Sequence, residues 1–266
     1  MQFWTLDEIE QHAMADHEVG EEIAPGVTIT RRRILQVGLA GAAGLLAMGC
    51  ATPARREQVL EQPAARPLTI DQLVAQLRPE ARRMIASDRP DEAAYLSAVS
   101  ALLARYKPDE PWAMRDVGES GWSMNTAAWM PPVVVFDIHM QPGSKIHLHD
   151  HRHYNGVLLC TEGSVRCRNF DIVQSDGERL DIAAGEVPTG EDFLIRQNKD
   201  TTLDRGQLST LSRDRDNIHH IEAGPDGCKL ADLFTYFRRE ARSYELDWDE
   251  QPLERGSNTY RVSWRS

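Results

Sequence analysis

Four histidines alternate with other residues in the segment KIHLHDHRHYNG. They are His147, His149, His151 and His153. Side chains two residues apart lie on the same face of a β-strand, so a strand here would place all four imidazoles on one face. Imidazole is the commonest metal ligand in proteins. We therefore predict a metal site that uses some of these histidines.

A third ligand is expected from a later strand. The segment DNIHHIEAG holds His219 and His220. Neighbouring strand residues point to opposite faces, so at most one of the two can reach the metal. Two histidines from one strand and one distant histidine would leave coordination positions open, which is typical of a catalytic site. Twisted strands diverge, so we expect His149 and His151 to bind, while a set with His147 and His149 stays open.

Two helices are expected before a run of short strands. Apolar residues at helical spacing begin after Leu68, and Pro79 is expected to break that stretch into two pieces. Residues 90–106 predict a second helix. From about Trp122, short apolar segments alternate with Gly, Asp and Pro turns, which predicts an all-β barrel or sandwich. The expected division is an extension with a signal segment (1–50), a linker (51–68), a helical segment (69–115), a barrel (116–245) and a C-terminal tail (246–266).

The stretch that ends at residue 50 has the pattern of an export signal. Residues 30–36 read TRRRILQ and lead into a mostly apolar, uncharged stretch. That stretch is shorter than the ~20 residues of a membrane span, and a double arginine before it is typical of a twin-arginine signal. Cys50 follows Ala-Met-Gly, which resembles a bacterial lipobox. We expect export to the periplasm and a lipidated Cys50; a buried helix with a basic start is the alternative.

The net charge of the chain bears on its binding partners, and its cysteines bear on a possible disulfide. The 266 residues carry a formal net charge of -11, and an acidic chain repels phosphate backbones, so nucleic acid is not an expected partner. Cys160 and Cys167 flank the turn TEGS. They could pair across a hairpin or serve as small core residues.

The spacing Gly143-x5-His149-x-His151, followed by a hydrophobic strand and Gly163, resembles the first motif of the cupin superfamily. The resemblance implies a double-stranded β-helix barrel with a metal inside. A cupin usually carries a glutamate four or five residues after the second histidine, where Asn155 and Gly156 stand here. The expected site therefore lacks the usual carboxylate ligand.

The stretch HLHDHRHYNGVLLCTEGSVR is similar to the core of the thiol dioxygenases, in the branch of cysteamine dioxygenase and the plant cysteine oxidases. Residues 149–151, Gly156 and Gly163 stand at that branch's positions, and residues 217–219 with Asp232 are similar to its second motif. The resemblance spans roughly residues 122–237 and selects His219 over His220. It implies an Fe(II) ion bound by His149, His151 and His219, a small thiol and O2 as substrates, and a sulfinic acid as product.

The same resemblance implies further roles in the site. Tyr236 and Asp232 are the implied catalytic residues: Tyr236 would position O2 or substrate, and Asp232 would bond a ligand histidine or a substrate amine. An ordinary strand aromatic and an ordinary strand carboxylate are the alternatives. Met124 stands where the free-cysteine branch has an arginine for the substrate carboxylate. This favours a thiol that lacks that carboxylate, or the N-terminal cysteine of a peptide.

Two other functions fit three histidines. A zinc-dependent cupin hydrolase or lyase could use the same ligands with a bound water. A non-catalytic, ligand-binding cupin lipoprotein is the third reading. Metal content and thiol-dependent O2 uptake would separate the three.

Overall fold

The computed structural model describes residues 66–107, 117–180, 192–238 and 241–265. The predicted export signal, Cys50 and the linker up to residue 65 lie outside the described residues. In the described part of the chain, no helix is long and apolar enough to cross a membrane.

Two helices begin the described chain, α2 (Ile70–Ile85) and α3 (Glu92–Leu103). Thr69 begins α2 with a capping box: its hydroxyl accepts from the Gln72 N–H, and the Gln72 side chain accepts from the Thr69 N–H. The prediction that Pro79 breaks this helix is wrong, because α2 runs through it. Proline removes one helical hydrogen bond, but the buried apolar face of α2 holds the helix against the barrel. That face consists of Leu73, Val74, Leu77, Ala81 and Met84.

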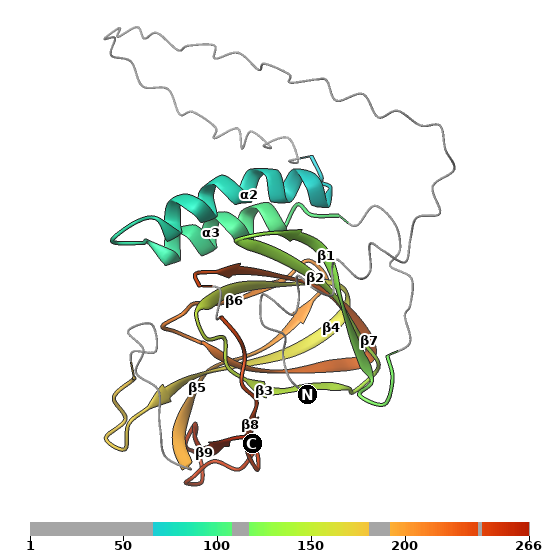
Figure 1. Cartoon of the computed structure of the whole chain (residues 1–266). Helices are drawn as coiled ribbons and strands as arrows, with labels where there is room; N and C mark the ends of the chain where they lie inside the picture. Colours follow the sequence, from blue (N-terminus) through green and yellow to red (C-terminus); the bar gives the residue numbers. More distant parts are fainter. Residues whose placement is uncertain (1–65, 108–116, 181–191, 239–240, 266) are drawn as a thin grey trace, which may run out of the picture.

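Nine strands of the described residues form one antiparallel sheet that curls around an apolar interior (Figure 1). They are β1 (Trp122–Met130), β2 (Val133–Met140), β3 (Lys145–His149), β4 (Tyr154–Val173), β5 (Asp192–Asp204), β6 (Leu208–Leu211), β7 (Ile218–Tyr236), β8 (Leu246–Asp247) and β9 (Thr259–Trp264). The order is β1-β2-β7-β4-β5-β9-β8, with β3 also on β7 and β6 also on β4. The predicted fold class, an all-β sheet fold after a short helical segment, is confirmed.

The long strands β4 and β7 form the centre of the sheet. They pair from Tyr154 opposite Tyr236 to Phe170 opposite Ile218, with register shifts near Gly163. Gly163 has a φ of 70°, and a Cβ built there would lie 2.1 Å from the Gly227 carbonyl oxygen. Glycine alone fits this close approach, so the course of β4 beside β7 at this register shift depends on it.

The sheet buries both of its faces near β2, β4 and β7. One face packs on α2 and α3, which lie together on one side of the sheet in Figure 1. Tyr95 of α3 hydrogen-bonds the Thr235 hydroxyl of β7 at 2.7 Å. The other face encloses the interior cluster that includes Phe136, Leu158 and Leu230.

The C-terminal segment extends the sheet. β9 pairs with β5 and β8 pairs with β9. Leu246 and Val262 pack in a cluster with Phe170 and Ile195. The three described cysteines are buried and free, so no disulfide joins Cys160 to Cys167, and both are core residues.

Candidate metal centre

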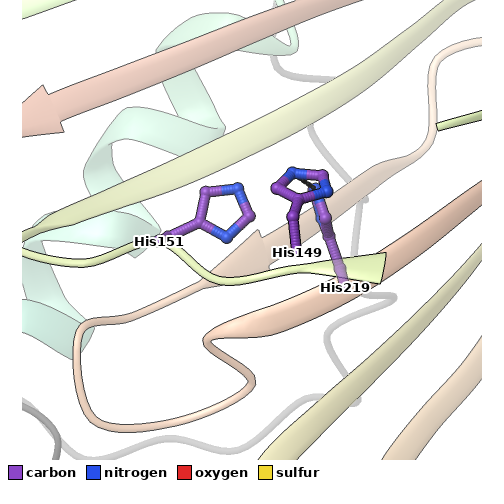
Figure 2. A group of neighbouring side chains, drawn as sticks. All are labelled: His149, His151 and His219. Atoms are coloured by element: carbon purple, nitrogen blue, oxygen red, sulfur yellow. Dashed lines mark hydrogen bonds between the residues drawn. The ribbon is translucent and has the colours of Figure 1, made fainter. Parts of the chain in front are cut away.

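Three histidines come together inside the barrel. His149 ends β3, His151 lies two residues later in the connection to β4, and His219 is the second residue of β7. His149 and His219 face each other in the β3–β7 pairing. All three are buried, and their candidate ligand atoms lie within 4.8 Å of one another. Figure 2 shows the ring of His151 beside those of His149 and His219. The sequence selected these three residues, and the structure places them in one group.

Hydrogen bonds leave the inner nitrogens of two rings available. Nδ1 of His149 bonds the His147 carbonyl at 2.7 Å, and Nδ1 of His151 bonds the Asn217 carbonyl at 2.8 Å. A carbonyl only accepts, so each Nδ1 carries the proton and each Nε2 keeps its lone pair. Nε2 of His149 lies 2.9 Å from Nε2 of His219, and Nε2 of His151 is buried without a partner among the described residues. Lone pairs that converge in this way suit a metal cation.

Burial keeps the three rings neutral. It lowers the pKa of His149 to about 4 and holds the pKa of His151 and of His219 well below the ordinary value. Neutral imidazole is the form that binds a metal. Within the described part of the chain, no aspartate, glutamate or cysteine joins the group. The three histidines therefore form a site that could bind a metal through nitrogen alone.

The prediction that all four alternating histidines share one strand face is wrong. β3 ends at His149, and its pairing with β7 is irregular between Ile146 and His149. His147 is exposed, and His153 lies in a turn with a φ of 66°. His149 lies beyond this irregularity and is buried, and the chain leaves strand geometry before His151. The alternative set with His147 is not brought together.

His220 faces away from the group. Its Nδ1 lies 3.2 Å from a guanidinium nitrogen of Arg168, and its ring packs 5.6 Å from that of Trp248. Burial, with the charge of Arg168, lowers the pKa of His220 to about 3. Adjacent strand residues thus point to opposite faces, as the sequence predicted for His219 and His220.

A C-terminal segment clamps the histidine loop. We call residues 241–247 the strap and residues 149–152 the histidine loop. The Asp150 N–H donates to the Tyr244 carbonyl at 3.0 Å, and the Tyr244 N–H donates to the Asp150 carboxylate at 2.6 Å. Arg152 and Arg242 exchange two backbone hydrogen bonds, at 3.0 and 3.2 Å. Sequence reasoning missed the strap, because its polar residues follow no regular pattern.

A small pocket, with a cavity volume of about 30 Å³ and part of it open to solvent, lies beside the histidines. His149 and His219 form part of its wall, and most of the other wall residues are apolar. The remaining lining residues are Trp122, Met124, Phe136, Ile138, Ile146, Tyr154, Ile221, Asp232, Phe234, Tyr236 and Ser243. No arginine or lysine is among the described residues of this wall. Both residues predicted to be catalytic, Asp232 and Tyr236, line the pocket.

The polar side chains of the pocket differ in the contacts they make with neighbouring side chains. Asp232 is buried, and burial raises the pKa of its carboxyl well above the ordinary value. Among the described residues, no hydrogen bond or ion pair to this carboxyl is present, so it does not bond a histidine. Tyr236 stacks on Tyr154, with ring centroids 5.0 Å apart. Tyr154 and Ser243 were not singled out from the sequence; the place of Tyr154, three residues after His151 at the start of β4, was the available signal.

Comparisons with known proteins found matches among solved structures alone. No family model and no curated protein sequence matches the chain. Solved structures similar to it include KdgF from Halomonas sp. (16% identity, TM-score 0.32, covering 47% of this chain and 86% of that chain). Another is an oxalate oxidase (12% identity, TM-score 0.34, covering 49% of this chain and 58% of that chain). A third is the Cnp3 cupin domain of Schizosaccharomyces pombe (8% identity, TM-score 0.31, covering 44% of this chain and 66% of that chain).

Proposed function

We propose that this protein is an iron-dependent thiol dioxygenase that oxidises a small thiol or an N-terminal cysteine to a sulfinic acid with O2. The observation that carries the proposal is a buried group of three neutral histidines beside a pocket, with no carboxylate among its described members. Neutral ligands leave a divalent cation its full charge, which favours a thiolate over a thiol. Fe(II), when bound, would supply the redox chemistry between the thiol and O2.

The reaction adds both oxygen atoms of O2 to the sulfur, so RSH and O2 give RSO2H. The residues of the chain would hold the reactants side by side, which lowers the entropic part of the barrier. The strap and Asn217 fix the histidine loop, and most residues of the pocket wall are apolar. The fixed loop and the mostly apolar wall support the proposal that a small thiol binds here.

The charges of the pocket support a particular kind of thiol. Asp232 is the one carboxyl among the described lining residues, and it suits a substrate that carries an amine. Met124 lines the wall, and no arginine or lysine is among the described lining residues to form an ion pair with a substrate carboxylate. We propose an aminothiol or an N-terminal cysteine, with Asp232 near its amine and Tyr236 in the same wall.

Export and membrane attachment are also proposed. The support is the sequence of residues 30–50, with its double arginine, its apolar stretch and Cys50. The twin-arginine route moves folded proteins, so iron could be bound in the cytoplasm before export. Attachment through a lipid at Cys50 would keep the barrel at a membrane surface.

The first test is the metal content of protein purified without chelator, followed by O2 uptake with cysteamine, free cysteine and a peptide with an N-terminal cysteine. We expect about one iron per chain and uptake that depends on an aminothiol or the peptide. His219→Ala is the control, and it should lose both the bound iron and the O2 uptake. Stoichiometric zinc, with no uptake after reconstitution with iron, would contradict the proposal and favour a hydrolase or lyase. Protein that binds no metal would favour a ligand-binding role.

A further inference from the structure

Two tyrosines line the pocket, and they stand at different distances from the histidines. Tyr154 begins β4, Tyr236 ends β7, and the two are opposite each other in the sheet. The ring of Tyr154 lies edge-on to His151, with centroids 4.9 Å apart. In the described part of the chain, the ring contacts of Tyr236 are with Tyr154 and Phe234 and not with a histidine. Tyr154 is thus the phenol next to the histidines, and Tyr236 is one ring farther away.

The hydroxyl of Tyr154 is held in place by the strap. It hydrogen-bonds the hydroxyl of Ser243, and both residues line the pocket. Ser243 lies between Arg242 and Tyr244, whose backbones bond the histidine loop. A hydroxyl can donate one hydrogen bond and accept two. When Ser243 donates to Tyr154, the phenolic proton is therefore available to a molecule in the pocket.

We infer that Tyr154, and not Tyr236, donates the hydrogen bond to the reactant that binds beside the three histidines, and that Ser243 is the positioning residue for this hydroxyl. The inference rests on the proposed function for the identity of that reactant, a thiolate or O2. A donor whose direction is set before the reactant arrives costs no reorganisation during the reaction. Tyr236 then has a packing role, as the ring on which Tyr154 stacks.

The first experiment compares two matched variants, Tyr154→Phe and Tyr236→Phe, in the iron-loaded full chain. Each removes one hydroxyl and leaves the ring stack in place. We expect Tyr154→Phe to lower kcat of thiol-dependent O2 uptake by about 100-fold, the effect of losing one oriented donor. Tyr236→Phe changes the pocket wall but not the proposed donor, so we expect its loss in kcat to be at least about 10-fold smaller than that of Tyr154→Phe. Iron content should be unchanged in both. A loss confined to Tyr236→Phe, or an equal loss in both variants, would overturn the inference.

The second experiment does not depend on turnover. Azide is titrated into the cobalt-loaded protein, and its binding is followed by visible absorption. We expect Tyr154→Phe to weaken azide binding by about 10-fold, as for one lost hydrogen bond to an anion, and Tyr236→Phe to weaken it much less. Unchanged binding in Tyr154→Phe would overturn the inference. Wild-type protein that binds azide in this way but oxidises no thiol would contradict the proposed function alone.

Ser243 gives a test that leaves both rings intact. We expect Ser243→Ala to reproduce part of the kcat and azide losses, because the phenol loses its fixed direction. Ser243→Thr keeps a hydroxyl at this position, so its kcat and its azide binding should both be close to those of the wild type. If Ser243→Ala matches the wild type in both measurements, the positioning role is wrong. This variant also decides the question if Tyr154→Phe does not fold.

Discussion

Asn217 holds His151 by three hydrogen bonds. Its side-chain amide donates to the His151 carbonyl at 2.9 Å and accepts from the His151 N–H at 3.1 Å, and its own carbonyl bonds the ring Nδ1 at 2.8 Å. The same residue lies two positions before His219. The motif Asn-Ile-His therefore supplies one member of the group and sets the tautomer of another.

At the scale of single residues, His151→Ala should abolish most metal binding. The variant removes one of three converging nitrogens, so the affinity for Fe(II) or Co(II) should fall by more than the roughly 10–100-fold that is typical of changes outside the ligand set. The measurement is the metal content after dialysis against a metal buffer.

The matched control is His147→Ala. The side chain of His147 is exposed, and its contact with His149 is made by the backbone carbonyl, which alanine keeps. We expect wild-type metal content in this variant. Equal loss in the two variants would show that the group of His149, His151 and His219 is not the ligand set.

At the scale of elements, local sequence patterns predicted where strands and helices lie, but they did not predict which distant segments contact one another. The strands begin at Trp122, as expected, and the second helix, α3, lies within the predicted residues 90–106. Pro79 shows why a local rule fails, because packing against the barrel outweighs one missing hydrogen bond. The paired motifs located His149 and His219. Nothing local could reveal that Ser243 meets Tyr154 from 89 residues away.

The close approach of β4 to β7 at Gly163 gives a prediction for an element. Gly163→Ala should lower the free energy of unfolding by the roughly 1–2 kcal/mol of a positive φ plus about 1–3 kcal/mol of overpacking against Gly227. Gly177 is the control: its φ is 85°, but a Cβ there would meet nothing within 4 Å. Gly177→Ala should therefore show the backbone cost alone. Urea unfolding would measure both, and equal losses would mean that the close approach to Gly227 does not matter.

At the scale of the whole molecule, residues 1–50 are predicted to decide where the barrel operates. Expressed in a bacterium with a twin-arginine pathway, the full chain should be found in the membrane fraction. Cys50→Ser should move it to the soluble periplasmic fraction, because an acyl chain supplies about 0.8 kcal/mol per buried CH₂ of anchoring. Changing Arg31 and Arg32 to lysine should keep the protein in the cytoplasm. Wild-type protein that stays cytoplasmic would contradict the export signal.

The position of the strap in the chain also determines when, during synthesis, the metal site can be completed. Asp150 of the histidine loop and Tyr244 of the strap are 94 residues apart in the chain, which a ribosome adds in roughly 5 to 20 s. For most of that interval His219 is also missing, and all three histidines are present without the strap only while the last 25 residues, from 219 to 244, are added, in roughly 1 to 5 s. The finished site therefore exists only in chains whose translation has passed the strap, and a chain that stops between His219 and the strap would present all three histidines with the histidine loop unclamped.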